Sequence, residues 1–226
     1  MAVETTPTPS LWLTLPAGFT SVDLDEDLGD RMARTATALD SAFPDAHSEQ
    51  KLSAVIAAET ALQAQLREGA VHVSSCLVRA GDGEPIHGML AVFVRPQELG
   101  PRGSYPDRAA EELAEAWPDA DVGVVDLPLG RAALAARDLA VPVPGVVWGV
   151  SESTVSTVRQ LELLIPHPWS PHVVAAVFTT EDLDHWSEWL PLLATAFRGI
   201  SFHPPRDESL DSLPPEQWDN IRKAFG

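Results

Sequence analysis

Residues 173–202 read VVAAVFTTEDLDHWSEWLPLLATAFRGISF, a strand pattern followed at once by a helix pattern. The first part, Val173–Phe178, is an uninterrupted apolar run of the length of a buried strand. Thr179 or Thr180 can cap a helix that begins at Glu181. The order of these signals predicts a buried strand that leads directly into a helix.

The predicted helix is amphipathic, and its apolar face should cover the sheet. Pro191 has no backbone N–H to donate, so we expect a kink at this position or a break with a second segment starting there. Gly199 ends the helix, and Ile200–Phe202 are expected to pair at a sheet edge. The apolar positions, spaced by three and four residues, are Leu183, Trp186, Leu190, Leu193 and Phe197.

Further strands and helices follow from the same periodicities. Gly81–Glu84 separates two apolar runs and predicts a hairpin. The predicted strands are residues 11–15, 71–80, 86–95, 122–129, 131–138 and 155–165. The other predicted helices follow Asp27 and end at Pro44, span Ser48–Glu68 with Leu52, Val55, Ile56, Leu62 and Leu66 on the buried face, and span Ala109–Trp117.

The element order predicts the α+β class, with one antiparallel sheet flanked by helices. With 226 residues, 45% of them hydrophobic, the chain can bury a sizeable core. We expect a flexible leader at residues 1–10, a single α+β domain at 11–203, and a C-terminal tail at 204–226 that carries a short amphipathic helix.

Two segments resemble the PsbP-like superfamily, which includes the actinobacterial LpqN-type proteins. They are LTLPAGF at Leu13–Phe19 and the stretch from VFTTEDLDHW to AFRGISF at Val177–Phe202. The resemblance implies an α/β/α sandwich around an antiparallel sheet and a role as a binding or assembly factor. The two segments carry packing residues, and the superfamily has no shared catalytic residues, so no catalytic residue can be carried over.

The charge balance limits the classes of partner that the chain is expected to bind. The net charge is -18, from 33 acidic and 15 basic residues, which opposes binding to nucleic acid and to anionic membranes and would attract a basic protein surface. Residues 1–10 lack the pattern of a secretory signal, so we expect a cytoplasmic protein. Cys76 is the single cysteine and suits a half-buried strand position.

No cofactor or metal motif is evident. The sequence has no glycine-rich phosphate-binding pattern, and no two of its seven histidines have the i, i+4 spacing of a helical zinc site. We therefore expect no cofactor and no metal. An alternative site assembled from dispersed side chains would use carboxylates with several of His72, His87, His167, His172 and His185.

Two apolar segments are candidate partner-binding elements. Leu139–Ser153 is punctuated by prolines and glycines, so we expect neither a central strand nor a helix there. Within it lies Val141–Val150, and an exposed apolar loop of this kind is often a binding site. In the tail, apolar residues recur at i, i+3 and i+7, as in a docking helix. Both segments can instead pack on their own domain. The candidate binding residues are Val143, Val146, Val147, Trp148, Trp218, Ile221 and Phe225.

These observations favour a non-catalytic cytoplasmic protein-binding or adaptor and assembly factor with an acidic surface. Two alternatives stay open. One is an immunity or antitoxin-like protein that neutralises a basic toxin, since such proteins are small and acidic. The other is a small-ligand binder or hydrolase built from the dispersed histidines and carboxylates.

Overall fold

The computed structural model describes residues 9–45, 47–143 and 154–204. Its main element is an antiparallel sheet in the order β2-β3-β4-β8-β7-β6-β5, so the chain has the expected α+β class. The strands are β2 (Phe19–Ser21), β3 (Ala70–Arg79), β4 (Pro85–Pro96), β5 (Asp121–Leu127), β6 (Gly130–Val143), β7 (Thr154–Pro166) and β8 (His172–Thr180). The apolar run that opens residues 173–202 is β8, the central strand, which explains why it lacks polar alternation.

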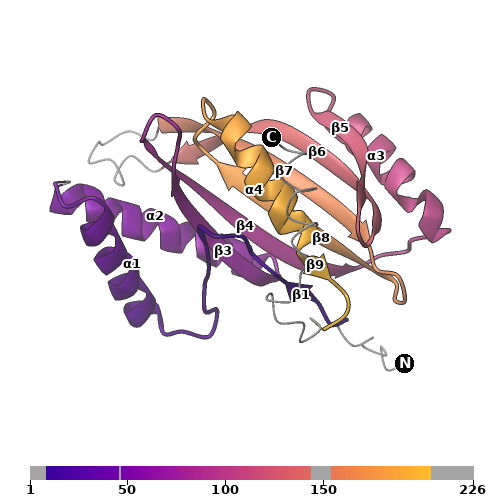
Figure 1. Cartoon of the computed structure of the whole chain (residues 1–226), viewed down its shortest axis with the longest axis horizontal. Coiled ribbons are helices and arrows are strands. Elements are labelled where there is room, and N and C mark those ends of the chain that lie inside the picture. The colour runs from indigo at the N-terminus through magenta and orange to yellow at the C-terminus, as the bar shows by residue number, and fades with distance from the viewer. Residues whose placement is uncertain (1–8, 46, 144–153, 205–226) are drawn as a thin grey trace, which may run out of the picture.

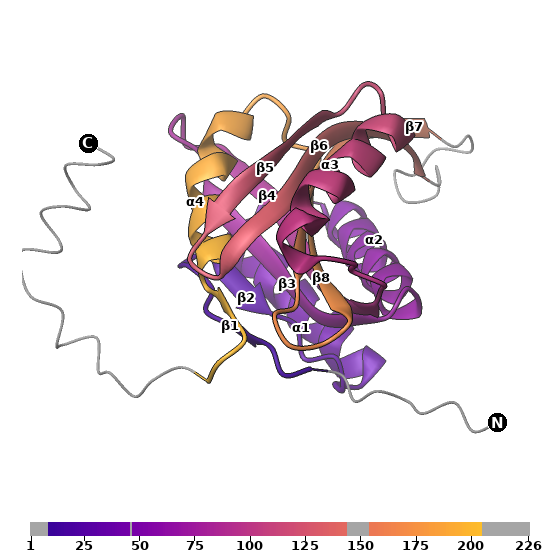
Figure 2. The ribbon, with the colours of Figure 1, turned by 90° about the vertical axis from the view of Figure 1, so that its right-hand side faces the viewer.

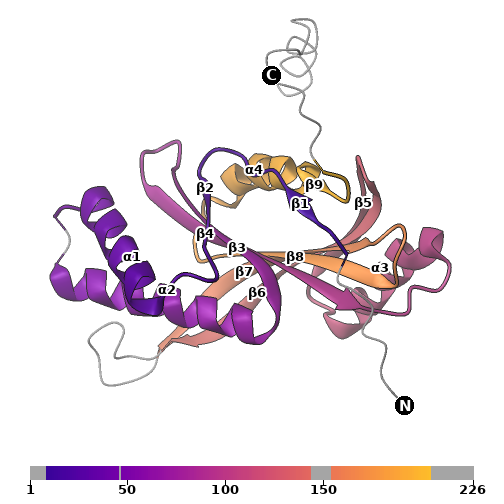
Figure 3. The same ribbon diagram turned by 90° about the horizontal axis from the view of Figure 1, so that it is seen from below.

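Helices cover both faces of this sheet, which gives the expected α/β/α sandwich (Figure 3). On one face lies α4 (Trp186–Arg198), together with a two-stranded sheet of β1 (Trp12–Leu13) and β9 (Ile200–Ser201). On the other face lie α2 (Ser48–Arg67) and α3 (Tyr105–Ala116), and α1 (Leu28–Ala42) packs beside α2 (Figure 2). A short 3₁₀ helix, η1 (Arg102–Ser104), precedes α3.

Large side chains of the helices pack on small or apolar strand residues. On the α4 face, Trp189 is fully buried with its ring centroid 4.9 Å from that of Phe178. On the opposite face, α2 places Leu62 over Ala91 and Phe93. The third cluster joins α3 to β6, with the buried residues Leu99, Tyr105, Ala109, Leu113, Ala133, Ala135 and Val173. Alanines on β6 let α3 approach the sheet closely.

The end of residues 173–202 differs from the prediction. β9 does not pair at the edge of the main sheet but with β1, in the register Trp12 to Ser201 and Leu13 to Ile200. Thr14 donates its backbone N–H to the carbonyl of Gly199 at 2.9 Å. A Cβ on Gly199 would collide with the Thr14 carbonyl, so this glycine permits the contact as well as ending α4.

The start of α4 also differs. The helix begins at Trp186 instead of Glu181, because Thr180 is still part of β8. The Thr180 hydroxyl donates to the His87 carbonyl at 2.7 Å and accepts from the Asp182 N–H at 3.1 Å, so it joins two strands and does not cap a helix. Of the two outcomes expected at Pro191, a kink or a break, the break is absent: α4 runs through this residue, with Trp189 before it and Leu193 after it on the same core.

The predicted apolar face of α2 is only partly correct. Val55 and Leu62 are buried, but Leu52 and Ile56 are 58% and 42% exposed. The reason is that α2 packs on the sheet through Leu62 and its C-terminal turns, whereas its middle is tied to α1 by a buried ion pair. Helix α3 starts at Tyr105, earlier than the predicted Ala109, because Tyr105 itself is buried in the first turn.

Part of the segment expected to be irregular is a strand. Leu139–Val143 continues β6 and pairs with Thr154–Val158 of β7, with Pro142 opposite Val155. The pairing of β6 with β5 ends at Ala136, so this part of β6 has only one neighbouring strand. A proline is tolerated there because the missing N–H can face the free edge.

Candidate binding surface

The feature that sets this sheet apart is a two-stranded arm. β7 pairs with β8 only from Arg159 onward, and β6 pairs with β5 only up to Ala136, yet β6 and β7 stay paired as far as Val143 and Thr154. Leu139–Val143 and Thr154–Val158 therefore extend past the last residues that pair with β5 and β8, and we call them the β6–β7 arm, at the end of β6 and β7 in Figure 1. Neither outer edge of this arm is paired within the part of the chain that the structure describes.

The arm carries apolar side chains on both faces. Val141 is 38% exposed and Val155, on the opposite face, is 66% exposed. Leu139 and Val158 form a directly opposed pair on the same face as Val141 and are half-buried. A protruding ribbon with several accessible aliphatic residues is typical of a protein contact surface.

Polar residues lie at the root of the arm, on the face that α3 covers. Arg137 follows Ala133 and Ala135 in the alternation of β6, and its Cζ lies 3.5 Å from the centroid of the Trp117 ring, just after α3. Glu162 is directly opposite Ala135 and therefore on this face as well. We call Trp117, Arg137, Gln160 and Glu162 the base patch.

The two charges of the base patch are half-buried, and no hydrogen bond or ion pair joins them, although Arg137 and Arg95 both favour the charged form of Glu162 electrostatically. Burial lowers the pKa of Arg137, and burial raises the pKa of Glu162. The Nε atom of Arg137 is buried without a hydrogen-bond partner among the described residues, and Glu162 accepts only one long bond there, 3.3 Å from Gln160 Nε2. An unpaired buried donor costs about 1–3 kcal/mol, and the stacking of the Arg137 guanidinium on the Trp117 ring offsets part of that cost.

On the opposite face, contacts of Arg159 hold the two strands together where the arm begins. Arg159 donates two hydrogen bonds to the carboxylate of Asp138, of 2.6 and 2.7 Å. The guanidinium of Arg159 also lies over the ring of Trp186, 5.2 Å from its centroid. The first residue of α4 thus supports the point at which the arm leaves the sheet.

A second group of charged residues joins the β3–β4 turn to α4. Both carboxylate oxygens of Glu188 accept from the Gly81 N–H, at 3.0 and 2.9 Å. His185 Nε2 lies 3.1 Å from Asp82, and this carboxylate raises the pKa of His185. Ligand atoms of Asp82, Glu84 and His185 lie within 4.8 Å of one another, but each Asp82 oxygen already has a partner, His185 or the Glu84 N–H. The contacts fasten the hairpin to the helix.

The histidines considered for a catalytic site are dispersed. His167 and His172 share the Ser170 hydroxyl, at 2.8 and 3.1 Å, in the turn between β7 and β8. Burial lowers the pKa of His167, and the nearby His172 and Arg102 lower it further. Arg102 is a cation whose Nε donates to the His167 carbonyl at 3.2 Å. His72, His87 and His185 lie elsewhere, on β3, on β4 and before α4. Of these five histidines, the described part of the chain brings only His167 and His172 together.

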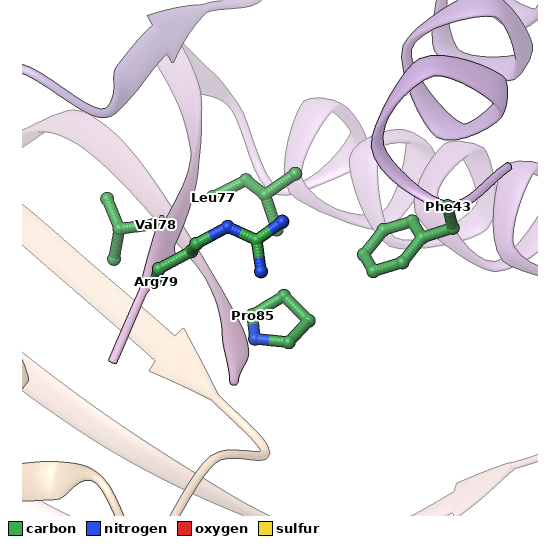
Figure 4. Close-up of a pocket in the computed structure, with 5 residues that line it drawn as sticks. All are labelled: Phe43, Leu77, Val78, Arg79 and Pro85. Carbon is green, nitrogen blue, oxygen red and sulfur yellow. The ribbon is translucent and has the colours of Figure 1, made fainter. Parts of the chain in front are cut away.

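One hollow lies between α1 and the β3–β4 hairpin (Figure 4). Phe43 faces Leu77 and Pro85 across it, and Arg79 extends between them. Its lining is apolar apart from Arg79, which donates to the Gly83 carbonyl at 3.0 Å. This lining holds no pair of groups for acid–base chemistry.

Of the predicted binding residues, the structure places only the backbone of Val143 in the arm. Val143 is the last residue of β6, but its side chain is not among those that the structure describes. The other six lie outside the described residues: Val146, Val147, Trp148, Trp218, Ile221 and Phe225. The sequence did not predict the base patch, although a signal existed, since Arg137 and Glu162 each interrupt an apolar strand run.

No known family model, curated protein or solved structure matches this chain. The relationship to the PsbP-like superfamily therefore stays a prediction based on the two sequence segments. Among the described helices, none has the length and apolar character needed to cross a membrane.

Proposed function

We propose that this chain is a non-catalytic cytoplasmic protein-binding or adaptor factor that contacts its partner through the β6–β7 arm. The observation that supports this proposal best is the exposure of Val141 and Val155 on a ribbon whose edges lack strand neighbours among the described residues. Such a ribbon can bury its valines only against another surface, and a partner strand could add to its free edge.

The charge of the chain favours a basic partner. A net charge of -18 accelerates association with a positively charged protein and slows association with an acidic one. An immunity or antitoxin-like protein that neutralises a basic toxin is one form of this function, supported by the same acidity.

The test compares captured partners from native lysate. Tagged wild-type protein is used beside a Val141→Asp, Val155→Asp double variant and a Leu190→Asp control, because Leu190 is also 46% exposed but lies on α4. We expect a stoichiometric partner that wild type and the control retain and the arm variant loses. Recovery of no stoichiometric partner by wild type, or equal retention by the arm variant, would contradict the proposal.

A further inference from the structure

We propose that the turn between β7 and β8 is an acid-sensitive switch, which stays closed while the His167 ring is neutral and opens when that ring gains a proton. We call His167, Trp169, Ser170 and His172 the His167 turn. It follows the end of β7 that lies away from the β6–β7 arm, so this inference goes beyond the proposed function.

The Nδ1 atom of His167 accepts hydrogen bonds from three donors of the turn. The backbone N–H groups of Trp169 and Ser170 point to this atom, at 3.3 and 3.1 Å. A backbone N–H can only donate, so Nδ1 carries no proton and the neutral ring carries its proton on Nε2. The Ser170 hydroxyl, 2.8 Å from Nδ1, therefore donates to it as well.

His172 completes this chain of hydrogen bonds. Its Nδ1 atom lies 3.1 Å from the same Ser170 hydroxyl. Because that hydroxyl gives its single proton to His167, His172 must donate, and its neutral ring carries the proton on Nδ1. The two neutral histidines are thus opposite tautomers. The backbone closes the same turn, since the His167 N–H donates to the His172 carbonyl at 2.8 Å.

A second proton on His167 is incompatible with this network. It can bind only at Nδ1, because Nε2 already carries one, and it would convert the acceptor into a donor that faces three other donors. The charge would also be poorly hydrated, because His167 is 4% exposed and its ring lies against Phe202, with the centroids 4.5 Å apart. Protonation of His167 therefore favours an open turn.

The charged and titratable groups around His167 add to this effect. On its own turn, His172 shares the Ser170 hydroxyl with it. From η1, Arg102 donates its Nε to the His167 carbonyl at 3.2 Å. After β9, His203 reaches the turn through the Trp169 ring, whose centroid lies 4.8 Å from its own. All of these groups are cationic when charged, and burial, His172 and Arg102 together lower the pKa of His167.

Acidification shifts the turn toward its open form. The closed turn lowers the pKa of His167, so opening takes up a proton. The closed form has its full stability above the ordinary value of about 6.5, and the ratio of open to closed turns rises about tenfold per pH unit as the pH falls from there toward the closed-state pKa. Opening separates Trp169, which is 61% exposed, from His167 and exposes the side of Phe202 that His167 covers.

The first test uses the full wild-type chain and NMR. At pH 7.5, the imidazole ¹⁵N shifts should show an unprotonated Nδ1 in His167 and a protonated Nδ1 in His172. As the pH is lowered, the opening constant from hydrogen exchange of the Ser170 amide should rise about tenfold per pH unit below 6.5 until His167 is protonated. The amides of Val174 and Ala176 in β8 should stay protected, because the sheet remains folded.

Two variants assign the opening to His167. An asparagine at this position can accept from backbone N–H groups ahead of it through its side-chain oxygen, as in an Asx-turn, but it does not titrate. His167→Asn should therefore keep the Ser170 amide protected and abolish the opening in acid. His203→Asn is the matched control, since His203 is exposed and also contacts Trp169, and it should keep the pH dependence of the wild type.

Several outcomes would overturn the switch. One is a protonated Nδ1 in neutral His167 at pH 7.5. Another is a Ser170 amide that loses its protection only together with Val174 and Ala176, which would be global unfolding. A third is a His167→Asn protein that opens in acid as the wild type does. The two wild-type measurements decide the question even if His167→Asn fails to fold.

Discussion

Arg31 on α1 and Glu59 on α2 form two parallel hydrogen bonds, 2.8 Å from Nε to Oε2 and 2.7 Å from Nη2 to Oε1. The Arg31 side chain is buried and the Glu59 side chain is 12% exposed, and Arg31 Nη1 also donates to the Glu26 carbonyl at 2.8 Å. Arg31 lowers the pKa of Glu59. This pair is the main polar link between a helix that does not lie on the sheet and one that does.

Replacement of Glu59 by glutamine should lower the free energy of unfolding by about 3 kcal/mol, because it leaves the buried Arg31 charge uncompensated. The folded-state pKa of Glu59 is lowered, so its contribution is present above the unfolded value of about 4.3 and is lost as the pH falls through the folded value. Urea denaturation at pH 7 and at low pH measures both effects. Asp40→Asn, in the exposed pair with Lys51, is the control and should change stability little. Equal effects of the two substitutions would contradict the argument.

Gly88 has no room for a side chain. A Cβ at this position of β4 would collide with the ring of Phe178 and lie 3.2 Å from Trp189 Cη2. Gly88→Ala should therefore destabilise the protein by about 1–3 kcal/mol through displacement of the α4 core. Gly123→Ala on the edge strand β5 is the matched control, since no atom lies within 4 Å of the point that its methyl group would occupy. Thermal melts followed by tryptophan fluorescence compare them, and a Gly88→Ala protein as stable as the control would refute close packing at this point.

The sequence predicted the helices and strands better than it predicted which of them pair or pack together. The apolar run of β8 and the spacing from Trp186 to Phe197 identified a strand and a helix, because burial on one or two faces leaves a periodic pattern. The prediction of a helix cap at Thr180 was wrong because threonine can cap a helix or bond across strands, and only the position of His87 decides between them. The sequence predicted no central strand at Pro142, and this part of β6 is instead a strand with one neighbour, because its pairing with β5 ends at Ala136; the sequence does not reveal where that pairing ends.

The candidate site was harder to predict from the sequence, for a related reason. Arg137 and Glu162 belong to strands whose register is set by the tertiary structure, and Trp117 comes from the end of a helix on top of them. The sequence shows two charges in apolar runs, but their proximity and their lack of an ion pair follow only from the packing of α3 on β6 and β7.

Glu162→Gln should raise the melting temperature at neutral pH. Burial raises the folded-state pKa of Glu162, so the folded protein binds the proton more tightly than the unfolded chain, and stability falls as the pH rises above about 4.3 toward the folded value. Glutamine resembles the protonated side chain and removes this loss. Calorimetry at pH 7.5 and pH 4 should show an advantage of the variant that shrinks on acidification. Glu115→Gln, at an exposed position of α3, should give no such pH-dependent difference, and an advantage that grew at pH 4 would contradict the sign.

The pair between His185 and Asp82 should be visible as a titration. The hydrogen bond to Asp82 raises the pKa of His185 in the folded protein, with smaller contributions from Glu188 and Glu84. The stability that this pair contributes is therefore complete below the unfolded value of about 6.5 and is lost as the pH rises through the folded value. NMR titration of the imidazole should give a midpoint above 6.5 in the wild-type protein and a lower midpoint in Asp82→Asn. Asp126→Asn, on the distant edge strand β5, should leave the midpoint unchanged. An Asp82→Asn protein with the wild-type midpoint would assign the shift to Glu188 and Glu84, and the proposed attachment of the hairpin through this ion pair would be wrong.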